Sequence, residues 1–211
     1  MDVLILIGSD SDAPVMSAAS DVLTELGVTS EMTVASAHRS PGRVLRLVKE
    51  APARGVRVFI VGAGAAAHLA GAVAAQTTLP VIGVPIDSSA LKGLDALLAT
   101  VQMPPGVPVA TVAIGKPGAT NAGVLAAQML ALSDGRIAAR LRAYKKQLED
   151  RVEEAARRLA AEQGKGQRAK GKGQRRGQRV KGKGRPKGKR TGKGDGQRRE
   201  RGQRRARLPS A

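Results

Sequence analysis

The stretch VLILIGSDSDAP, at residues 3–14, indicates the fold class because it joins an unbroken apolar run to a short polar turn. A continuous apolar run of this kind is typical of a parallel strand that is buried on both faces. The turn carries Ser and Asp, which favour helix starts, and leads into an amphipathic segment at residues 13–26. The stretch therefore predicts a strand, a strand-end loop and a helix, which is the repeating unit of a doubly wound sheet.

The same alternation continues over the first 130 residues. Further apolar runs predict strands at residues 33–35, 56–61, 81–84 and 107–114. The intervening segments predict helices at residues 13–26, 41–53, 65–76, 88–100 and 117–132. Gly27 and Gly55 fit the ends of the first two helices, and Pro41 fits the start of the second. This order predicts an α/β protein, a three-layer α/β/α sandwich whose ligands bind beyond the carboxyl ends of parallel strands.

Residues 133–161 predict a long C-terminal helix with one narrow apolar stripe. Its apolar residues recur at spacings of three and four: Ile137, Leu141, Tyr144, Leu148, Val152, Ala155 and Leu159. Such a stripe packs either against another subunit or against the helix's own domain. We favour the first interpretation, an oligomerisation helix that closes a domain of residues 1–162.

The charge of the chain is concentrated in residues 163–211. This segment holds 20 of the 36 Lys and Arg residues and 2 of the 17 Asp and Glu residues, so residues 1–162 are nearly neutral. It is rich in Gly and Gln and almost free of apolar residues, which predicts a disordered tail. Its charge suits non-specific binding to RNA or other anionic surfaces. A nucleic-acid-binding protein, with the tail as its active part, is therefore the alternative function.

Other classes of protein are excluded by composition. The chain has no cysteine, which excludes disulfides and thiolate chemistry, and its two histidines lack the spacing of a zinc site. The first apolar run is too short for a signal peptide, and no run of about 18 apolar residues is present to span a membrane. The sequence predicts a cytoplasmic protein without a metal site.

The loop after the first predicted strand, residues 8–12, can hold a phosphate. Its small residues let a ligand approach the backbone, and its amides and the hydroxyls of Ser9 and Ser11 lie where a helix begins. Asp12 can accept hydrogen bonds from ribose hydroxyls. The alternative is that Ser and Asp only cap the helix.

The loop after the second predicted strand places His38 beside Arg39, after Ser36 and before a helix. Histidine is suited to proton transfer near neutral pH, and arginine can hold a phosphate or carboxylate through two parallel hydrogen bonds. The alternative is an ordinary pair of surface side chains. The position at a strand end, where ligands of such sheets bind, favours the functional interpretation.

The loop after the third predicted strand reads GAGAAAH at residues 62–68. It loosely matches a G-x-G-x-x-A dinucleotide fingerprint, with Asp87 where a ribose-binding acid would stand. The motif follows the third strand, however, whereas the fingerprint belongs to the first. Both histidines, His38 and His68, thus fall on strand-end loops, which favours one shared site.

Taken together, these loops resemble the class I 5-(carboxyamino)imidazole ribonucleotide mutases. The matching motifs are Gly8-Ser9-x-Ser11-Asp12, Ser36-Ala37-His38-Arg39-x-Pro41, Gly62-Ala63-Gly64-x-Ala66-Ala67-His68-Leu69-x-Gly71, Pro80-Val81-x-Gly83-Val84-Pro85, Val101-Gln102-Met103-Pro104 and Ala113-Ile114-Gly115. The resemblance covers about residues 3–150, and the basic tail has no counterpart in it. The family usually has Gly in place of Ala65 and Pro in place of Ala70.

The resemblance implies a flavodoxin-like sheet, a homo-octamer and no metal or organic cofactor. It implies an isomerase of de novo purine biosynthesis that converts 5-(carboxyamino)imidazole ribonucleotide to 4-carboxy-5-aminoimidazole ribonucleotide by decarboxylation and recarboxylation. His38 would be the general acid and base. The residues implied to bind the ribonucleotide are Ser9, Ser11, Asp12, Ser36 and Arg39. Gly64 and His68 would line the region that holds the carbon dioxide.

Overall fold

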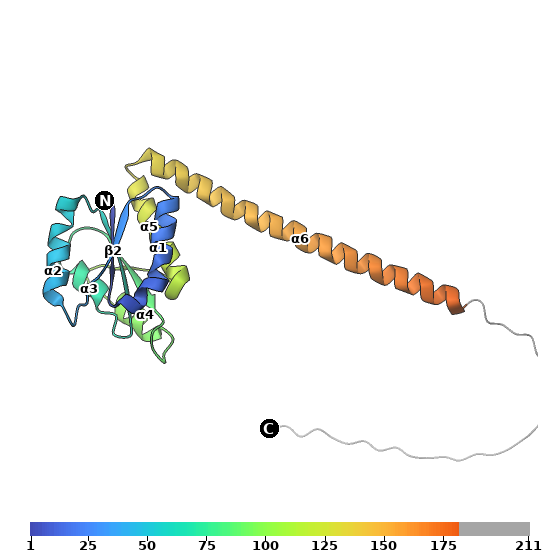
Figure 1. Cartoon of the computed structure of the whole chain (residues 1–211), viewed down its shortest axis with the longest axis horizontal. Coiled ribbons are helices and arrows are strands. Elements are labelled where there is room, and N and C mark those ends of the chain that lie inside the picture. The colour runs from blue at the N-terminus through green and yellow to red at the C-terminus, as the bar shows by residue number, and fades with distance from the viewer. Residues whose placement is uncertain (182–211) are drawn as a thin grey trace, which may run out of the picture. The chain divides into compact units, whose positions relative to one another are not determined.

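A parallel sheet forms the centre of the protein. The computed structural model describes residues 1–181, with side chains as far as Glu162 (Figure 1). Within this part of the chain the sheet has five strands: β1 (Val3–Ile7), β2 (Ser30–Val34), β3 (Val58–Gly64), β4 (Val81–Ile86) and β5 (Ala110–Thr111). Every pairing is parallel, and the strand order is β2-β1-β3-β4-β5. This order is the flavodoxin-like one, so the predicted fold class is confirmed.

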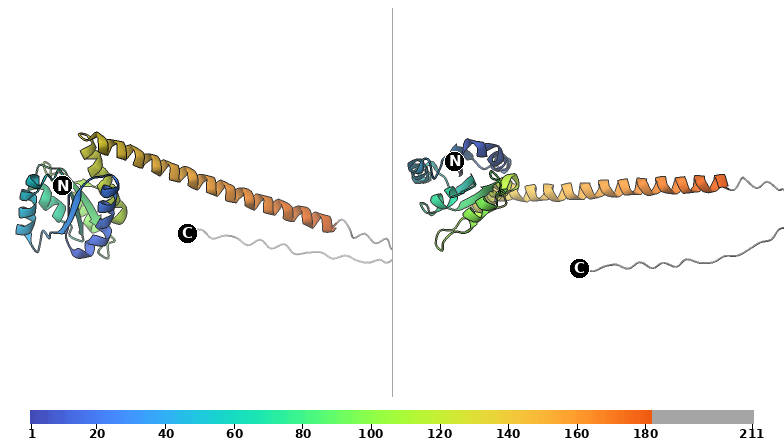
Figure 2. Two further views of the ribbon diagram at one scale, coloured as in Figure 1. Left: turned by 45° about the horizontal axis from the view of Figure 1, so that its top comes forward. Right: turned by 90° about the horizontal axis from the view of Figure 1, so that it is seen from below.

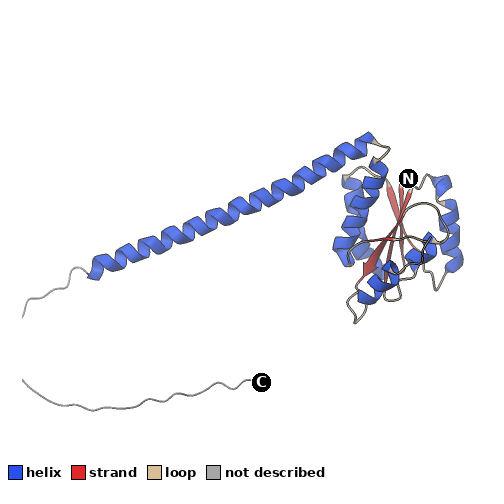
Figure 3. Ribbon diagram, turned by 180° about the vertical axis from the view of Figure 1, so that it is seen from behind, coloured by secondary structure: helices blue, strands red, loops and turns tan. Residues whose placement is uncertain are grey.

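Helices cover both faces of the sheet. They are α1 (Ala13–Glu25), α2 (Pro41–Glu50), α3 (Leu69–Ala74), α4 (Leu94–Val101), α5 (Gly115–Ala131) and α6 (Gly135–Lys181), with short 3-10 turns η1 (Asp10–Asp12) and η2 (Pro52–Arg54). The left view of Figure 2 shows α1 and α2 on opposite sides of the sheet. Figure 3 shows the strands enclosed between helices. The result is the α/β/α sandwich that the sequence predicts.

The strands are apolar on both faces because each face packs against helices. Along β1, Val3, Ile5 and Ile7 join a core with α1 and α5, whereas Leu4 and Leu6 join a second core with α2 and α3. All five residues of β1 are buried. This explains why a central parallel strand is recognised from an unbroken apolar run.

Strand boundaries differ from the prediction where the apolar signal is weak. The second strand was expected at residues 33–35 but runs from Ser30 to Val34, because it is an edge strand with a polar outer face. The third strand extends beyond residue 61 to Gly64. Gly62 pairs with β1 and β4, whereas Ala63 and Gly64 pair with β4. The fifth strand is only Ala110–Thr111, much shorter than residues 107–114.

The helix predicted at residues 65–76 begins later than expected, at Leu69. Ala65 has a φ of 50°, and two tight turns follow, with Ala67 N–H donating to the Ala65 carbonyl and His68 N–H to that of Ala66. The helix predicted at residues 88–100 likewise begins at Leu94. In both cases, the residues after the strand form a strand-end loop instead of the first helical turn.

Helix α6 is longer than predicted. It runs from Gly135 to Lys181, so residues 163–181, which the sequence assigned to a disordered tail, are helical. That expectation was wrong for residues 163–181. Their glycines disfavour a helix, but Gln, Lys and Arg are good helix formers, and extending an existing helix avoids the cost of nucleation. Residues 182–211, the rest of the predicted tail, lie outside the described residues.

The apolar stripe of α6 changes its surroundings along the helix. Ile137 is buried and, with Leu141 and Tyr144, packs on the core formed with α1 and α5. Further along, Leu148 is 41% and Val152 is 68% exposed. The chain divides into two units, Met1–Ala155 and Ala156–Ala211, whose boundary falls inside α6. The boundary predicted at residue 162 stays a prediction.

As far as the described residues go, the chain has no helix with the length and apolar character needed to cross a membrane.

Candidate active site

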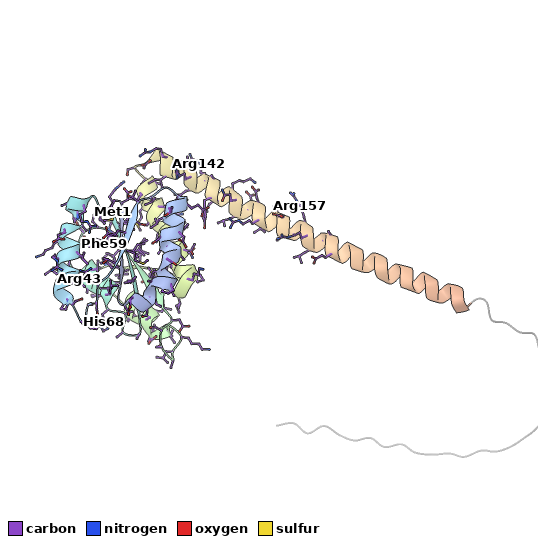
Figure 4. The ribbon with its side chains drawn as sticks, in the orientation of Figure 1. Met1, Arg43, Phe59, His68, Arg142 and Arg157 are labelled. Carbon is purple, nitrogen blue, oxygen red and sulfur yellow. The ribbon has the colours of Figure 1, made fainter. Side chains whose placement is uncertain are left out.

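The carboxyl ends of the strands surround one pocket. Because the strands are parallel, the loops after β1, β2, β3 and β4 all lie at the same edge of the sheet. In Figure 4, His68 lies at the opposite end of the body from Met1, which precedes β1, with Phe59 of β3 between them. The pocket has a volume of about 400 Å³. Its lining comprises Gly8, Ser9, Ser11, Asp12, Ser36, Ala37, His38, Arg39, Ala63, Gly64, Ala66, Leu69 and Ser88.

The structure therefore brings the residues singled out in the sequence to one place. Those of the first two loops, together with Gly64, line the pocket directly. His68 is outside the lining but contacts it through His38. The roles of these residues in binding and catalysis remain predictions.

The loop after β1 is held by its own side chains. Ser9 is the N-cap of η1, its hydroxyl accepts a hydrogen bond from Ser11 N–H, and Asp12 Oδ2 accepts one from Ser9 N–H at 3.0 Å. The loop is thus a capping box, as the alternative interpretation required. Because the capped turn also lines the pocket, capping and ligand binding are compatible here.

Asp12 is a buried carboxyl beside this pocket. It is only 6% exposed. Burial raises the pKa of Asp12 above its ordinary value, and the Ser9 hydrogen bond and the positive charge of Arg39 oppose this shift with smaller effects. The loop therefore holds the Asp12 side chain in place, and its burial makes the ionised form less favourable than it is in water.

The loop after β2 is tied to the loop after β1 by Arg39. Its Nη2 donates a hydrogen bond to the Gly8 carbonyl at 3.0 Å, while its backbone N–H and Nε donate to Ser36 Oγ at 3.2 and 3.4 Å. Arg39 is exposed and lines the pocket. The guanidinium is thus oriented before any ligand arrives, which lowers the entropic cost of binding an anion.

The two histidines form a hydrogen-bonded pair. His38 Nε2 and His68 Nδ1 lie 2.9 Å apart, and the ring planes meet at 75°. One ring must donate and the other accept, so the tautomer of one histidine fixes that of the other. Both residues are exposed at the mouth of the pocket. The pair can therefore hold a proton next to a bound ligand and exchange it.

The loop after β3 does not form a dinucleotide fingerprint. Gly62 and Gly64 belong to the strand itself, and α3 begins only at Leu69. A Cβ on Gly62 would lie 2.6 Å from Met16 Sδ of α1, so this glycine serves packing between strand and helix. Asp87 is not among the residues that line the pocket.

Sequence reasoning missed the residues that complete the pocket beside this loop. Ala63 ends the buried part of β3, Leu69 opens α3, and Ser88 follows β4 by two residues. Only the pairing of Gly64 with Ile86 brings Ser88 next to the β3 loop. The available signal was its place at the start of the helix predicted at residues 88–100, just after a strand end. Within the described residues, no group of three or more His, Asp or Glu side chains is placed to hold a metal ion.

A parallel α/β body with a polar pocket and a histidine pair at its carboxyl edge defines an α/β enzyme of the doubly wound class. The comparisons narrow this class to one family. The model of the AIR carboxylase family matches residues 2–151, and the chain belongs to that family. The resemblance read from the loop motifs is thereby confirmed.

Similar proteins carry consistent names. N5-carboxyaminoimidazole ribonucleotide mutase of Thermotoga maritima is 52% identical over 155 residues, covering 74% of this chain and 90% of the relative. The protein of that name in Pyrococcus horikoshii is 54% identical, with 74% and 86% covered. A crystal structure of Treponema denticola PurE superposes with a TM-score of 0.66 at 28% identity, covering 72% of this chain and 94% of that one.

Proposed function

We propose that this protein is an N5-carboxyaminoimidazole ribonucleotide mutase of purine biosynthesis. Its substrate would be 5-(carboxyamino)imidazole ribonucleotide and its product 4-carboxy-5-aminoimidazole ribonucleotide. The observation that carries the proposal is the pocket in which His38 and the Ser9–Asp12 turn meet. The name shared by the relatives, at about half of all positions identical, supports the choice of substrate.

In this proposal the ribonucleotide binds through its phosphate and ribose at the loops after β1 and β2. Arg39 and the hydroxyls of Ser9, Ser11 and Ser36 would hold the phosphate, because they provide a fixed cation and short neutral donors. Asp12 would accept hydrogen bonds from the ribose. The imidazole ring would then extend toward His38 and the β3 loop.

The proposed chemistry needs proton transfer and retention of carbon dioxide. His38 donates a proton to the exocyclic nitrogen as its bond to the carboxyl carbon breaks, which releases carbon dioxide inside the pocket. The ring carbon attacks the carbon dioxide, and His38 then removes the proton from that carbon. Protons balance, since His38 gives one and regains one. Gly64 and His68 would line the space that holds the carbon dioxide. Because the trapped molecule lies next to the ring carbon, the enzyme need not bind carbon dioxide from solution.

The direct test is an assay with two alternative substrates. The purified chain is given either the carbamate substrate without bicarbonate or the decarboxylated ribonucleotide with bicarbonate, and formation of the 4-carboxy product is followed. We expect rapid product formation from the carbamate. Product formation only from the decarboxylated ribonucleotide with bicarbonate would contradict the mutase assignment and indicate a carboxylase.

The homo-octamer and the cytoplasmic location also belong to the proposal. Exposed apolar side chains on two helices support assembly, because such patches usually mark interfaces. Leu94, Leu98 and Val101 of α4 are each about half exposed, and Leu148 and Val152 extend the stripe of α6. Sedimentation of the purified chain tests the stoichiometry. A monomer at micromolar concentration would contradict the proposed assembly.

The basic segment 163–211 is proposed to bind RNA or other polyanions without sequence preference. The high positive charge of the segment supports binding to phosphate groups. Because the chain has only one Tyr and one Phe, stacking of bases on aromatic side chains would contribute little. A truncated chain lacking residues 163–211 should keep full mutase activity and lose RNA binding. Equal RNA affinity in the truncated chain would contradict a role for the segment.

A further inference from the structure

The pocket has two chemically different ends. The polar side chains of the β1–β2 end are Ser9, Ser11, Asp12, Ser36 and Arg39, and the β3–β4 end is formed by Ala63, Gly64, Ala66, Leu69 and Ser88. The first end carries a guanidinium, three hydroxyls and the buried carboxyl of Asp12. The second is made of small or apolar residues, and Ser88 is its hydrogen-bonding side chain. The strand order β2-β1-β3-β4 places these ends on opposite sides of the pocket.

Ser88 lies directly over Gly64. Gly64 pairs with Ile86 in the sheet, and Ser88 follows two residues later. A Cβ added to Gly64 would lie 2.7 Å from Ser88 Cβ and would overlap Ser88 Oγ. Any side chain at residue 64 would therefore displace Ser88. The glycine is thus explained by the space that this serine occupies, since Gly64 is not among the glycines with positive φ.

The Ser88 hydroxyl is available to a ligand. Ser88 is exposed and lines the pocket, and its hydroxyl makes no hydrogen bond within the described part of the chain. The neighbouring Ser89 differs, since its Oγ accepts a hydrogen bond from Leu91 N–H at 3.1 Å and it does not line the pocket. Ser89 is therefore a matched control for Ser88.

We propose that the Ser88 hydroxyl binds the migrating carboxyl group and keeps the released carbon dioxide in place. This inference rests on the proposed mutase function. If the phosphate occupies the β1–β2 end, the imidazole ring reaches past His38, and its carboxyl substituent lies at the β3–β4 end. A neutral donor suits this position. A cation would hold the carboxylate more tightly than carbon dioxide and would oppose decarboxylation.

The apolar neighbours of Ser88 fit the same role. Carbon dioxide is small and uncharged, so Ala63, Ala66 and Leu69 can retain it without ordering water around it. One hydroxyl donor then orients the molecule toward the ring carbon. Loss of this donor should let carbon dioxide escape before recarboxylation, and the decarboxylated ribonucleotide should leave as a by-product.

The test measures what fraction of turnovers forms the 4-carboxy product and what fraction releases carbon dioxide into solution. Excess enzyme is mixed with carbamate substrate labelled in the carboxyl group, and the label is measured in the 4-carboxy product and in released carbon dioxide, with an enzyme-free blank subtracted. For Ser88→Ala we expect the ratio of escape to product to rise about 3- to 10-fold, the effect of losing one neutral hydrogen bond. Ser89→Ala should match the wild type.

An unchanged ratio in Ser88→Ala would overturn this inference and leave the mutase function standing. An equal rise in Ser88→Ala and Ser89→Ala would also overturn it, because it would indicate a general disturbance of the loop. Failure of the wild-type enzyme to form product from the carbamate would instead refute the proposed function and the inference with it.

Discussion

The two ends of the pocket differ in the kind of residue that lines them, since one is polar and charged and the other is nearly apolar. The β1–β2 end holds its polar groups in a network, in which Arg39 bonds to Gly8 and Ser36 and Asp12 bonds to Ser9. The β3–β4 end relies on shape, with the absence of a side chain at Gly64 making room for Ser88. In the proposed function, the charged end would fix where the nucleotide lies, and the nearly apolar end would let the reacting group change its charge. Substitutions at the two ends should therefore affect different kinetic constants.

The largest effect is expected between the two ends, at His38. His38→Asn keeps a polar side chain but cannot carry the proton, so kcat should fall about 10²- to 10⁴-fold. Binding of the product ribonucleotide, measured by calorimetry, should change little because the β1–β2 end is intact. A near-normal kcat in this variant would show that His38 is not the general acid and base of the proposed reaction.

At the β1–β2 end, Arg39→Ala should mainly weaken binding. The guanidinium offers charge-assisted hydrogen bonds, whose loss corresponds to about a 10- to 100-fold rise in KM. The ratio of escaped carbon dioxide to product should stay at the wild-type value, in contrast to Ser88→Ala. Arg43→Ala is a suitable control, because Arg43 bonds to Val34 and Thr33 of β2. A raised escape ratio in Arg39→Ala would contradict the separation of the two ends.

The effect of Asp12→Asn, also at the β1–β2 end, should depend on pH. Since burial raises the pKa of Asp12 in the folded state, ionisation of this group costs stability as pH rises through that pKa. Asn stays neutral and can still accept the Ser9 hydrogen bond. The variant should therefore gain stability relative to wild type near pH 7, and the gain should vanish below about pH 4, the ordinary pKa of an aspartate side chain. Urea unfolding at both pH values measures this, and a gain that is independent of pH would contradict it.

The smallest effect concerns the backbone of the β3 loop. Ala65 has a φ of 50°, where alanine is strained and glycine is not. Ala65→Gly should therefore stabilise the fold by up to about 1 kcal/mol and leave kcat unchanged. Ala66→Gly, at the next residue, should destabilise it slightly. Equal stabilisation by both variants would show that strain at residue 65 is not the cause.

The sequence predicts those features that depend on local pattern. The strand β1 and the polar loops after β1 and β2 follow from residue type and order, because a strand buried on both faces is a short, β-branched apolar run that ends at turn residues. It also places both histidines on strand-end loops, and the structure adds that their rings meet.

Features that depend on neighbours across the sheet are not predicted from the sequence. Glycine has a weak intrinsic preference for strands, and Gly64 belongs to β3 only because it pairs with Ile86 of β4. Ser88 enters the pocket through that same pairing. The length of α6 was underestimated for a different reason, since its continuation to Lys181 rests on helix propagation instead of core packing.

A crystal structure with the 4-carboxy product ribonucleotide bound would show directly which end of the pocket holds the phosphate. We expect the phosphate within hydrogen-bonding distance of Arg39 and Ser36, the imidazole ring beside His38, and the carboxylate against Ser88. A product bound in the reverse direction, with its phosphate at Gly64 and Ser88, would refute the proposed division of the pocket, as would a product bound outside this pocket.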